Sequence, residues 1–213
     1  MAEGLRERKK RQTRQHISDT ATGLFLERGF DAVTIAEIAE AADVSVNTVY
    51  NYFPAKEDLF FDRSKGLIDR LSRFVRARAV GESAAAAVLR ELREEVESVS
   101  PKVGLIEGYE RFMKVVHGSA ALQARLWHLQ RRQYDDLEAT LRQETGAADD
   151  DPLPGLMAGQ MNWVHQSLMT AIAHEMIAGR EPEVVSREAL VLLDEMADLL
   201  SEKVLNYAVR ADG

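Results

Sequence analysis

The sequence contains no cysteine, and this absence limits how the chain can be stabilised and what it can bind. Disulfide bridges and thiolate metal sites are excluded, so the 213 residues need no oxidising compartment. No apolar run approaches the roughly 20 residues of a membrane span, and no apolar signal segment follows the basic N-terminus. With 46% hydrophobic residues, the chain can bury a core. We expect a soluble, cytoplasmic globular protein with no membrane partner.

The sequence also lacks the motifs of common catalytic sites. It has no G-x-S-x-G, no phosphate-binding P-loop and no H-E-x-x-H, because His174 and Glu175 are followed by Met-Ile-Ala. The candidate metal ligands are His117, His128, His165 and His174 with Glu107 or Glu175. None of them pair at a ligand spacing on one helical turn. We predict no enzymatic activity, no cofactor and no metal. A helical metal-binding or interaction protein is an alternative.

Acidic residues are in excess, and the formal net charge of −8 by itself disfavours nucleic acid as a partner. The charge is unevenly distributed, however. Residues 1–56 hold eight Lys or Arg and eight Asp or Glu, so the whole excess lies in residues 57–213. The first 14 residues are basic, and their bases include Lys9, Lys10 and Arg11. This segment is either a solvated tail or an arm that binds phosphates.

Helical periodicity dominates what is present, and no run of alternating β-branched residues predicts a strand. A first helix has one apolar face and ends at Gly29, which is placed to be its left-handed cap. Thr34–Glu37 has the pattern of a capping box that opens a second helix. Ser45 can cap a third helix that reaches Phe53, and Pro54 fits the first turn of a fourth. The order helix, turn, helix follows.

The third helix is expected to face outward. Val49 and Phe53 are one turn apart and can point inward together, which leaves a wider outer arc of Ser45, Val46, Asn47, Thr48, Tyr50, Asn51 and Tyr52. A helix of this size fits the major groove of DNA, where Asn, Ser and Thr pair with base edges and valine methyls contact a thymine methyl. Tyrosine and Lys56 suit phosphates. The alternative is an ordinary polar surface helix.

Residues 33–60, VTIAEIAEAADVSVNTVYNYFPAKEDLF, resemble the DNA-binding segment of the tetracycline-repressor-like (TetR/AcrR) family. The resemblance includes T-x-x-x-I-A near the start and Y-x-Y-F-x-x-K-E-x-L near the end, and it covers roughly the first quarter of the chain. It implies phosphate contacts for Thr34, Tyr50, Tyr52 and Lys56, and base-facing positions for Ser45, Val46, Asn47 and Thr48. Asp43 and Asn47 depart from the family pattern, because glycine is common at both positions. At position 47 the asparagine adds a side chain for a base contact.

The remaining residues predict six further helices, so we expect an all-α protein of about nine helices. The fourth runs from Pro54 to Ala79, and later breaks fall near Ser100, Gly118, Gly146 and Gly179. We predict that residues 1–54 form a helix-turn-helix DNA-binding domain with a basic N-terminal arm. Residues 55–213 then form a larger helical domain for effector binding and dimerisation.

The last two expected helices carry more apolar surface than one small domain needs. The family resemblance implies a four-helix interface between this pair and its two-fold mate, which sets two recognition helices about 34 to 36 Å apart. We therefore expect a homodimer on a palindromic operator in double-stranded DNA. The candidate interface residues are Leu168, Ile172, Leu193 and Leu200. Packing within the subunit is the alternative for part of this surface.

The middle of the chain supplies aromatic residues and a few polar groups, the mixture typical of a small-molecule pocket. The resemblance implies a central cavity between these helices. The candidate lining residues are Phe74, Tyr109, Phe112, Met113, Trp127, Gln130, Tyr134, Trp163 and Gln166, and the same helices carry Leu126, Met161, His165 and Met169. Plain core packing is the alternative for each of them.

These observations predict a dimeric, ligand-responsive transcription regulator, most simply a repressor that a small molecule releases from its operator. The alternative within the same class is a constitutive DNA-binding protein without an effector.

Overall fold

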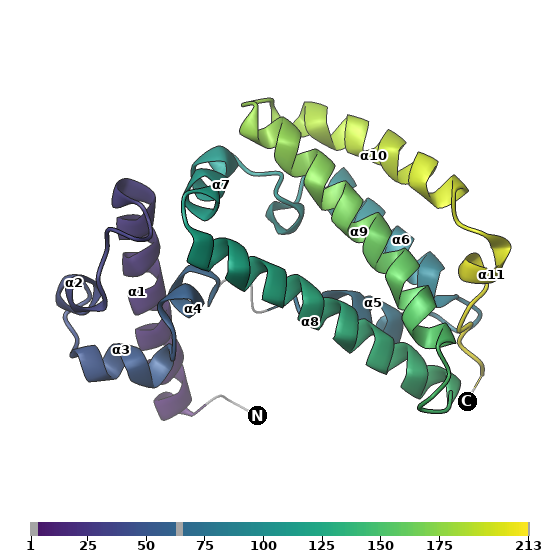
Figure 1. The fold of residues 1–213 in the computed structure, drawn as a ribbon, viewed down its shortest axis with the longest axis horizontal. Coiled ribbons are helices and arrows are strands. Elements are labelled where there is room, and N and C mark those ends of the chain that lie inside the picture. Colours follow the sequence, from purple (N-terminus) through teal and green to yellow (C-terminus); the bar gives the residue numbers. More distant parts are fainter. Residues whose placement is uncertain (1–3, 63–65, 213) are drawn as a thin grey trace. The chain divides into compact units, whose positions relative to one another are not determined.

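The computed structural model describes residues 4–62 and 66–212, and within these ranges every regular element is a helix. The all-α prediction is therefore confirmed, with eleven α-helices in the described residues, nine of which have seven residues or more. The chain divides into two compact units (Figure 1). Unit 1 comprises Met1–Lys65 and Arg111–Trp127, and unit 2 comprises Gly66–Glu110 and His128–Gly213.

Unit 1 contains the expected helix-turn-helix. Its elements are α1 (Leu5–Arg28), α2 (Ile35–Ala41), α3 (Val46–Tyr52), α4 (Lys56–Phe60), most of α7 (Tyr109–His117) and the first residues of α8 (Ala120–Thr145). α1 packs against α2 and α4, and α2 packs against α3. An aromatic cluster joins α1 to α4, because the ring centre of Phe25 lies 4.9 Å from that of Phe30 and 6.0 Å from that of Phe60. α3 is joined to these helices through its packing against α2.

The predicted helix boundaries in unit 1 are confirmed where local chemistry sets them. Gly29 follows α1 at φ 84°, a conformation that glycine adopts without strain. Thr34 and Glu37 form the reciprocal capping box of α2, with 3.2 Å from the Glu37 amide to Thr34 Oγ1 and 2.7 Å from the Thr34 amide to Glu37 Oε2. Ser45 caps α3 by accepting the Thr48 amide at 3.0 Å. Short-range hydrogen bonds therefore define the start of both helices.

Unit 2 is a helical bundle around a second core. Its elements are α5 (Arg70–Ala77), α6 (Ala84–Glu97), the 3-10 turn η2 (Pro101–Val103), the rest of α8, α9 (Leu153–Ile177), α10 (Pro182–Asp198) and α11 (Glu202–Leu205). α6, α9 and α10 contact one another, and they enclose fully buried residues such as Leu92, Leu168 and Leu193. The long α9 supplies a large share of this core.

Two predicted helices are each divided. The expected helix from Pro54 to Ala79 is wrong, because α4 begins only after Ala55 and α5 begins at Arg70. Pro54 lies outside α4, where the Asp58 carboxylate accepts the Ala55 amide and caps the helix instead. Likewise, α10 ends at Asp198 and residues 202–205 form the separate α11, which a serine precedes in extended conformation.

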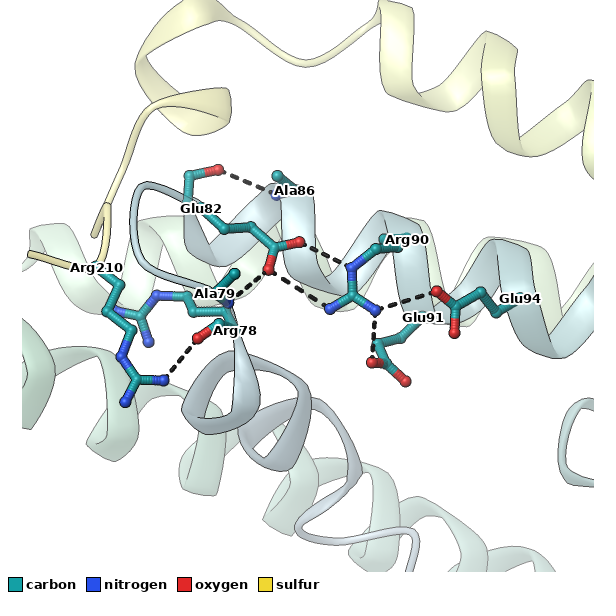
Figure 2. Close-up of polar contacts among 9 residues, drawn as sticks. Arg78, Ala79, Glu82, Ala86, Arg90, Glu91, Glu94 and Arg210 are labelled. Atoms are coloured by element: carbon teal, nitrogen blue, oxygen red, sulfur yellow. Dashed lines mark hydrogen bonds and ion pairs between the residues drawn. The ribbon is translucent and has the colours of Figure 1, made fainter.

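The C-terminal segment fastens the end of α5 in unit 2 (Figure 2). Arg210 Nη1 donates to the Arg76 and Arg78 carbonyl oxygens at 3.2 and 2.6 Å, and the Arg210 amide donates to the Glu82 carbonyl oxygen at 3.0 Å. Glu82 also binds Arg90 of α6 at 2.9 Å. The last carbonyls of α5, which have no partner inside that helix, are satisfied in this way.

Candidate nucleic-acid interface and ligand-binding unit

α3 presents an exposed face held by two buried anchors. Val49 and Phe53 are fully buried, whereas Val46 is 39% and Tyr50 is 50% exposed. Asn47 and Asn51 are exposed beside them, and within the described residues no hydrogen bond engages the Asn47 amide. An exposed helical surface with amide and methyl groups can meet base edges in a major groove. The residues that the sequence assigned to base reading therefore lie together on one helix.

Ser45 and Thr48 differ from their neighbours because their hydroxyl groups already have partners. Ser45 Oγ accepts the Thr48 amide and lies 2.8 Å from Thr48 Oγ1. Each hydroxyl keeps further hydrogen-bonding capacity. These two residues therefore fix the start of α3 in addition to any contact with DNA.

Thr34, a predicted phosphate contact, is exposed at the start of α2. Its hydroxyl donates to Glu37 Oε2 at 2.7 Å. Arg28 binds the same carboxylate at 2.6 Å, and the pKa of Glu37 falls to about 2 through Arg28 first and Thr34 second. The negative charge of Glu37 is thus paired within unit 1, which favours an approaching phosphate compared with an unpaired carboxylate.

Lys56, another predicted phosphate contact, is turned toward the core of unit 1. Its Nζ donates to the Phe30 carbonyl oxygen at 2.6 Å and lies 4.3 Å from the centre of the Phe30 ring. Burial lowers the pKa of Lys56 from its ordinary value. An ammonium group has three donors. One of the three donors of Lys56 binds the turn after α1, a structural role that the sequence motif alone did not indicate.

Arg14 also belongs to unit 1, and in the sequence it is recognisable only as one of the basic residues near the N-terminus. From α1, its Nη1 donates to the Tyr52 carbonyl oxygen at 2.5 Å, its Nη2 binds Asp62 at 2.8 Å, and its guanidinium lies 4.2 Å from the centre of the Phe53 ring. It therefore fastens the C-terminal end of α3. Tyr52 is half-buried beside it. The spacing along the sequence gives no signal for this contact, because 38 residues separate Arg14 from Tyr52.

The predicted basic arm is helical. Lys9, Lys10 and Arg11 are exposed residues of α1, which begins at Leu5. Their charges are therefore displayed on a helix that continues into the core of unit 1. A rigid helical display loses less conformational entropy on binding than a flexible tail.

The residues assigned to an effector pocket divide between the two units. Phe112, Met113 and Trp127 belong to unit 1, where Phe112 stacks on Phe60 with ring centres 4.6 Å apart. Trp127 is 61% exposed. The residues in unit 2 are Phe74, Tyr109, Gln130, Tyr134, Trp163 and Gln166. Phe74 is buried in the core there, whereas Trp163 is 41% exposed on α9.

Unit 2 holds a chain of amide side chains between α8 and α9. Gln130 Nε2 donates to Gln166 Oε1 at 3.0 Å, and Gln133 Nε2 donates to the Leu67 carbonyl oxygen at 2.7 Å. Gln166 Nε2 lies 3.4 Å from Gln133 Oε1, so Gln166 contacts both glutamines of α8. Tyr134 donates to the Gly155 carbonyl oxygen at 3.1 Å. Of the nine predicted pocket residues, Gln130 and Gln166 are brought into direct contact.

Arg70 and His165 are buried polar residues near these amides. Arg70 ion-pairs with Glu95 and donates to the Lys102 carbonyl oxygen at 3.0 Å. Burial, and then the nearby charge of Arg70, lower the pKa of His165 to about 3. Arg70 had no sequence signal, because its partners come from other helices. In the sequence, His165 was visible as a histidine on a pocket-lining helix and as one of four candidate metal ligands.

The four predicted interface residues, Leu168, Ile172, Leu193 and Leu200, are each at most 7% exposed in a single chain. They pack in the core of their own unit and so have almost no surface left to bury against a second subunit. A groove of about 700 Å³ between α9 and α10 is lined by one of the four, Ile172, and by residues that include Ser167, Thr170, Ala171, Glu188 and Leu192. Thr170 follows exposed Trp163 by seven residues, so both lie on the same face of α9.

Within residues 4–62 and 66–212, no group of three or more His, Asp or Glu side chains could hold a metal ion. No helix in the described part of the chain is long and apolar enough to cross a membrane.

The family model for bacterial regulatory proteins of the tetR family matches residues 17–62, which build α3 and the helices that hold it. The HTH-type transcriptional regulator TcmR of Streptomyces glaucescens is 33% identical over 104 residues, which are 45% of this chain and 46% of TcmR. The regulator AcrR of Shigella flexneri is 31% identical over 138 residues, or 62% of this chain and 63% of AcrR. In these segments the chain is similar to TetR-like regulators.

The TetR-like fold extends beyond the matched segment. The solved SmeT–triclosan complex superposes with a TM-score of 0.56 at 18% identity, and the match covers 91% of this chain and 94% of SmeT. The sequence matches are shorter than this structural match. In them, the chain spans about half the length of TcmR and less than two thirds of AcrR. These relatives are transcriptional regulators by name.

Proposed function

We propose that this protein is a homodimeric repressor that binds double-stranded operator DNA through α3 and is released by a small molecule bound in unit 2. The main observation in support is the exposed face of α3. There Asn47 has no hydrogen-bonding partner in the described structure, while Val49 and Phe53 on the opposite face are buried. Such a surface supports base reading. Tyr50 and the basic start of α1 support phosphate contacts.

Selection of bound duplexes from a random pool tests the DNA-binding part. Wild-type protein should return a palindrome, and Asn47→Ala should change the preferred base at one symmetric position in each half-site, by about 1 to 3 kcal/mol. Lys203→Ala, at an exposed position of α11 in unit 2, serves as the control and should return the wild-type motif. An unchanged motif for Asn47→Ala would remove this residue from base reading.

The arm is tested by salt dependence. Replacing Lys9, Lys10 and Arg11 with Ala should lower affinity for all duplexes and reduce the slope of log K against log salt by about 0.9 for each phosphate that the variant no longer binds. An unchanged slope would leave the helical start of α1 without a role in binding DNA.

The dimer is proposed to form through the exposed face of α9 and α10. Small residues such as Ser167 and Ala171 in the groove allow another helix to approach closely, and Trp163 and Val191 are exposed beside it. Thr170→Arg should therefore yield a folded monomer that binds a palindrome weakly. Gln143→Arg adds the same charge on α8 and should stay dimeric. Light scattering distinguishes the two, and a dimeric Thr170→Arg would place the interface elsewhere.

The effector is proposed to bind in unit 2, because this unit is larger than DNA reading requires and contains buried polar groups in an apolar core. The similar fold of SmeT was solved as a complex with triclosan. A ligand found by thermal shift should reduce operator affinity by the same factor by which operator reduces ligand affinity. If ligands stabilise the protein but leave operator affinity unchanged at saturation, a constitutive DNA-binding protein becomes the better account.

A further inference from the structure

Besides Asp69 Oδ1, which forms an ion pair with Arg73, three buried polar atoms in unit 2 have no hydrogen-bond partner within the described residues. They are Arg70 Nε, His165 Nε2 and Asn162 Oδ1. Arg70 and His165 are each only 3% exposed. Burying a donor or acceptor without a partner is unfavourable, so such atoms are rare in folded proteins. Their concentration in one unit calls for a physical explanation.

These atoms belong to one region of unit 2. Asn162 and His165 are three residues apart and therefore share a side of α9, and Gln166 beside them contacts Gln130 and Gln133 of α8. Arg70 of α5 is close enough for its charge to act on His165. α5, α8 and α9 thus bring Arg70, Asn162, His165 and the glutamines together, and we call these residues the buried polar cluster.

Together with the Glu95 carboxylate, the buried polar cluster carries no net charge. Arg70 is paired with Glu95, which is itself largely buried. Asp69, the neighbouring carboxylate on the chain, lies 3.4 Å from Arg73. Burial keeps His165 neutral at physiological pH, because it lowers the pKa to about 3. A ligand anion would find no uncompensated cation here, and a ligand cation would meet the guanidinium of Arg70.

The hydrogen-bonding character of the cluster can be assigned atom by atom. Gln166 Nε2 lies 3.5 Å from His165 Nδ1, and an amide nitrogen can only donate, so Nδ1 accepts. The single proton of the neutral imidazole is then on Nε2. His165 Nε2 and Arg70 Nε are therefore two unused N–H donors, and Asn162 Oδ1 is one unused acceptor.

We propose that the buried polar cluster binds the oxygen of a neutral effector, namely a carbonyl or hydroxyl group carried on an apolar body. The oxygen accepts from Arg70 and His165, and a hydroxyl can also donate to Asn162. The buried Phe74 ring, whose centre lies 5.9 Å from the Arg70 guanidinium, offers the apolar body an aromatic neighbour. This inference rests on the proposed function in placing the effector in unit 2, and it adds the effector's chemical class.

The test uses three probes with one ring and different charges: cyclohexanone, cyclohexanecarboxylate and cyclohexylammonium. Each is titrated at millimolar concentration into full-length protein without DNA, with the five histidines labelled with nitrogen-15. The His165 signal, assigned by its loss in His165→Gln, should show the neutral Nε2–H form. Cyclohexanone should shift it in a saturable manner, and the two charged probes should not.

Matched variants locate the binding. His165→Phe keeps an aromatic ring but removes the donor, so affinity for cyclohexanone should fall about tenfold or more, in line with the cost of an unpaired buried group. His174→Gln, at a side chain that is 81% exposed, should bind as wild type does. If His165→Phe does not fold, His165→Gln and the wild-type titration still decide the outcome.

Three results would overturn the proposal: a stronger response to the carboxylate or the amine, a melting-temperature increase without any change at His165, or no binding of cyclohexanone. None of these depends on operator DNA. A saturable cyclohexanone signal without any effect on operator affinity would retain the ligand class and reject release from DNA. Release from DNA by a ligand that does not affect His165 would do the reverse.

Discussion

Unit 1 and unit 2 use their polar side chains in different ways. In unit 1, Arg14 and Lys56 are turned inward but bind carbonyl oxygens at the ends of helical segments, while Asn47 is exposed to solvent. In unit 2, by contrast, Arg70 and His165 are buried and each retains a polar atom without a partner. Unit 1 does contain one such atom, Arg125 Nε, although Arg125 also pairs with Asp58 at 2.5 Å.

The difference corresponds to the two kinds of recognition proposed for the two units. A surface that reads DNA needs exposed polar groups on a rigid support, because the duplex approaches from solvent. A site for a small molecule needs polar groups in an apolar interior, where each hydrogen bond discriminates strongly. The observed distribution matches these requirements unit by unit. The following predictions test that comparison, beginning with the largest effect.

The largest effect is expected in the core of unit 2. Leu193→Asp should lower the free energy of unfolding by about 3 to 5 kcal/mol, because Leu193 is fully buried in a single chain and the new carboxylate has no partner. Urea unfolding followed by circular dichroism measures the loss. A Leu193→Asp protein that is a monomer of wild-type stability would show that this residue belongs to a subunit interface after all.

The next effect concerns pH. The folded-state pKa of His165 is lowered to about 3 from 6.5, so between these values the unfolded chain binds more protons. Its contribution to stability is fully present above pH 6.5 and is lost as pH falls toward 3. Between pH 6 and pH 4 this loss amounts to about 2 kcal/mol.

Urea titrations of wild-type protein and His165→Gln at several pH values isolate that contribution. His165→Gln should flatten the pH dependence by about 2 kcal/mol over this interval relative to the wild type. Equal slopes for wild type and His165→Gln would mean that His165 is hydrated, and the contrast between the units would lose its main support.

The sequence predicted unit 1 in more detail than unit 2, and the reason is the range of the interactions. Gly29, Thr34 and Ser45 act on residues at most four positions away, so the pattern of the chain contains the whole interaction. Arg14 and Lys56 have partners 38 and 26 residues away. Their tertiary roles could not be predicted from local spacing, although the same two residues were recognisable as basic.

In unit 2 the helices themselves were predictable, but their packing was not. The apolar repeat that includes Leu193 indicates a buried face without showing whether the same subunit or its partner covers it. Similarly, the buried position of Arg70 is apparent only from its contacts with Glu95 and Lys102, which lie on other elements. The exposed Trp163 illustrates the same limit, since an aromatic residue is equally compatible with a pocket, a core or an interface.

Lys56 gives a smaller effect that distinguishes support from DNA contact. Lys56→Met keeps the aliphatic stem but removes the bond to the Phe30 carbonyl oxygen and the charge above its ring. Unfolding stability should fall by about 1 to 2 kcal/mol. The salt slope of DNA binding should stay near the wild-type value. A slope reduced by about 0.9 with unchanged stability would instead identify Lys56 as a phosphate contact.

The smallest effect concerns Asp43 and Asn47, the two positions at which this sequence lacks the glycine that is common in the family it resembles. Asp43, in the turn between α2 and α3, has a left-handed backbone with φ 52°, whereas Asn47 is helical within α3. Asp43→Gly removes the steric cost of a side chain in that conformation and should stabilise unit 1 by about 0.5 kcal/mol. Asn47→Gly should destabilise it by about 0.4 kcal/mol, since glycine is the poorer helix former.

Urea unfolding of both variants, with Asp43→Ala as a third, measures these differences. Asp43→Ala keeps a β-carbon but loses the tolerance of aspartate for this backbone, so it should be about 1 kcal/mol less stable than Asp43→Gly. The same substitution by glycine thus has opposite signs four residues apart, because the backbone and not the residue type determines the outcome. If Asp43→Ala equals Asp43→Gly in stability, the turn does not require a left-handed residue, and the rigid placement of α3 must depend on Arg14 and the buried anchors Val49 and Phe53 alone.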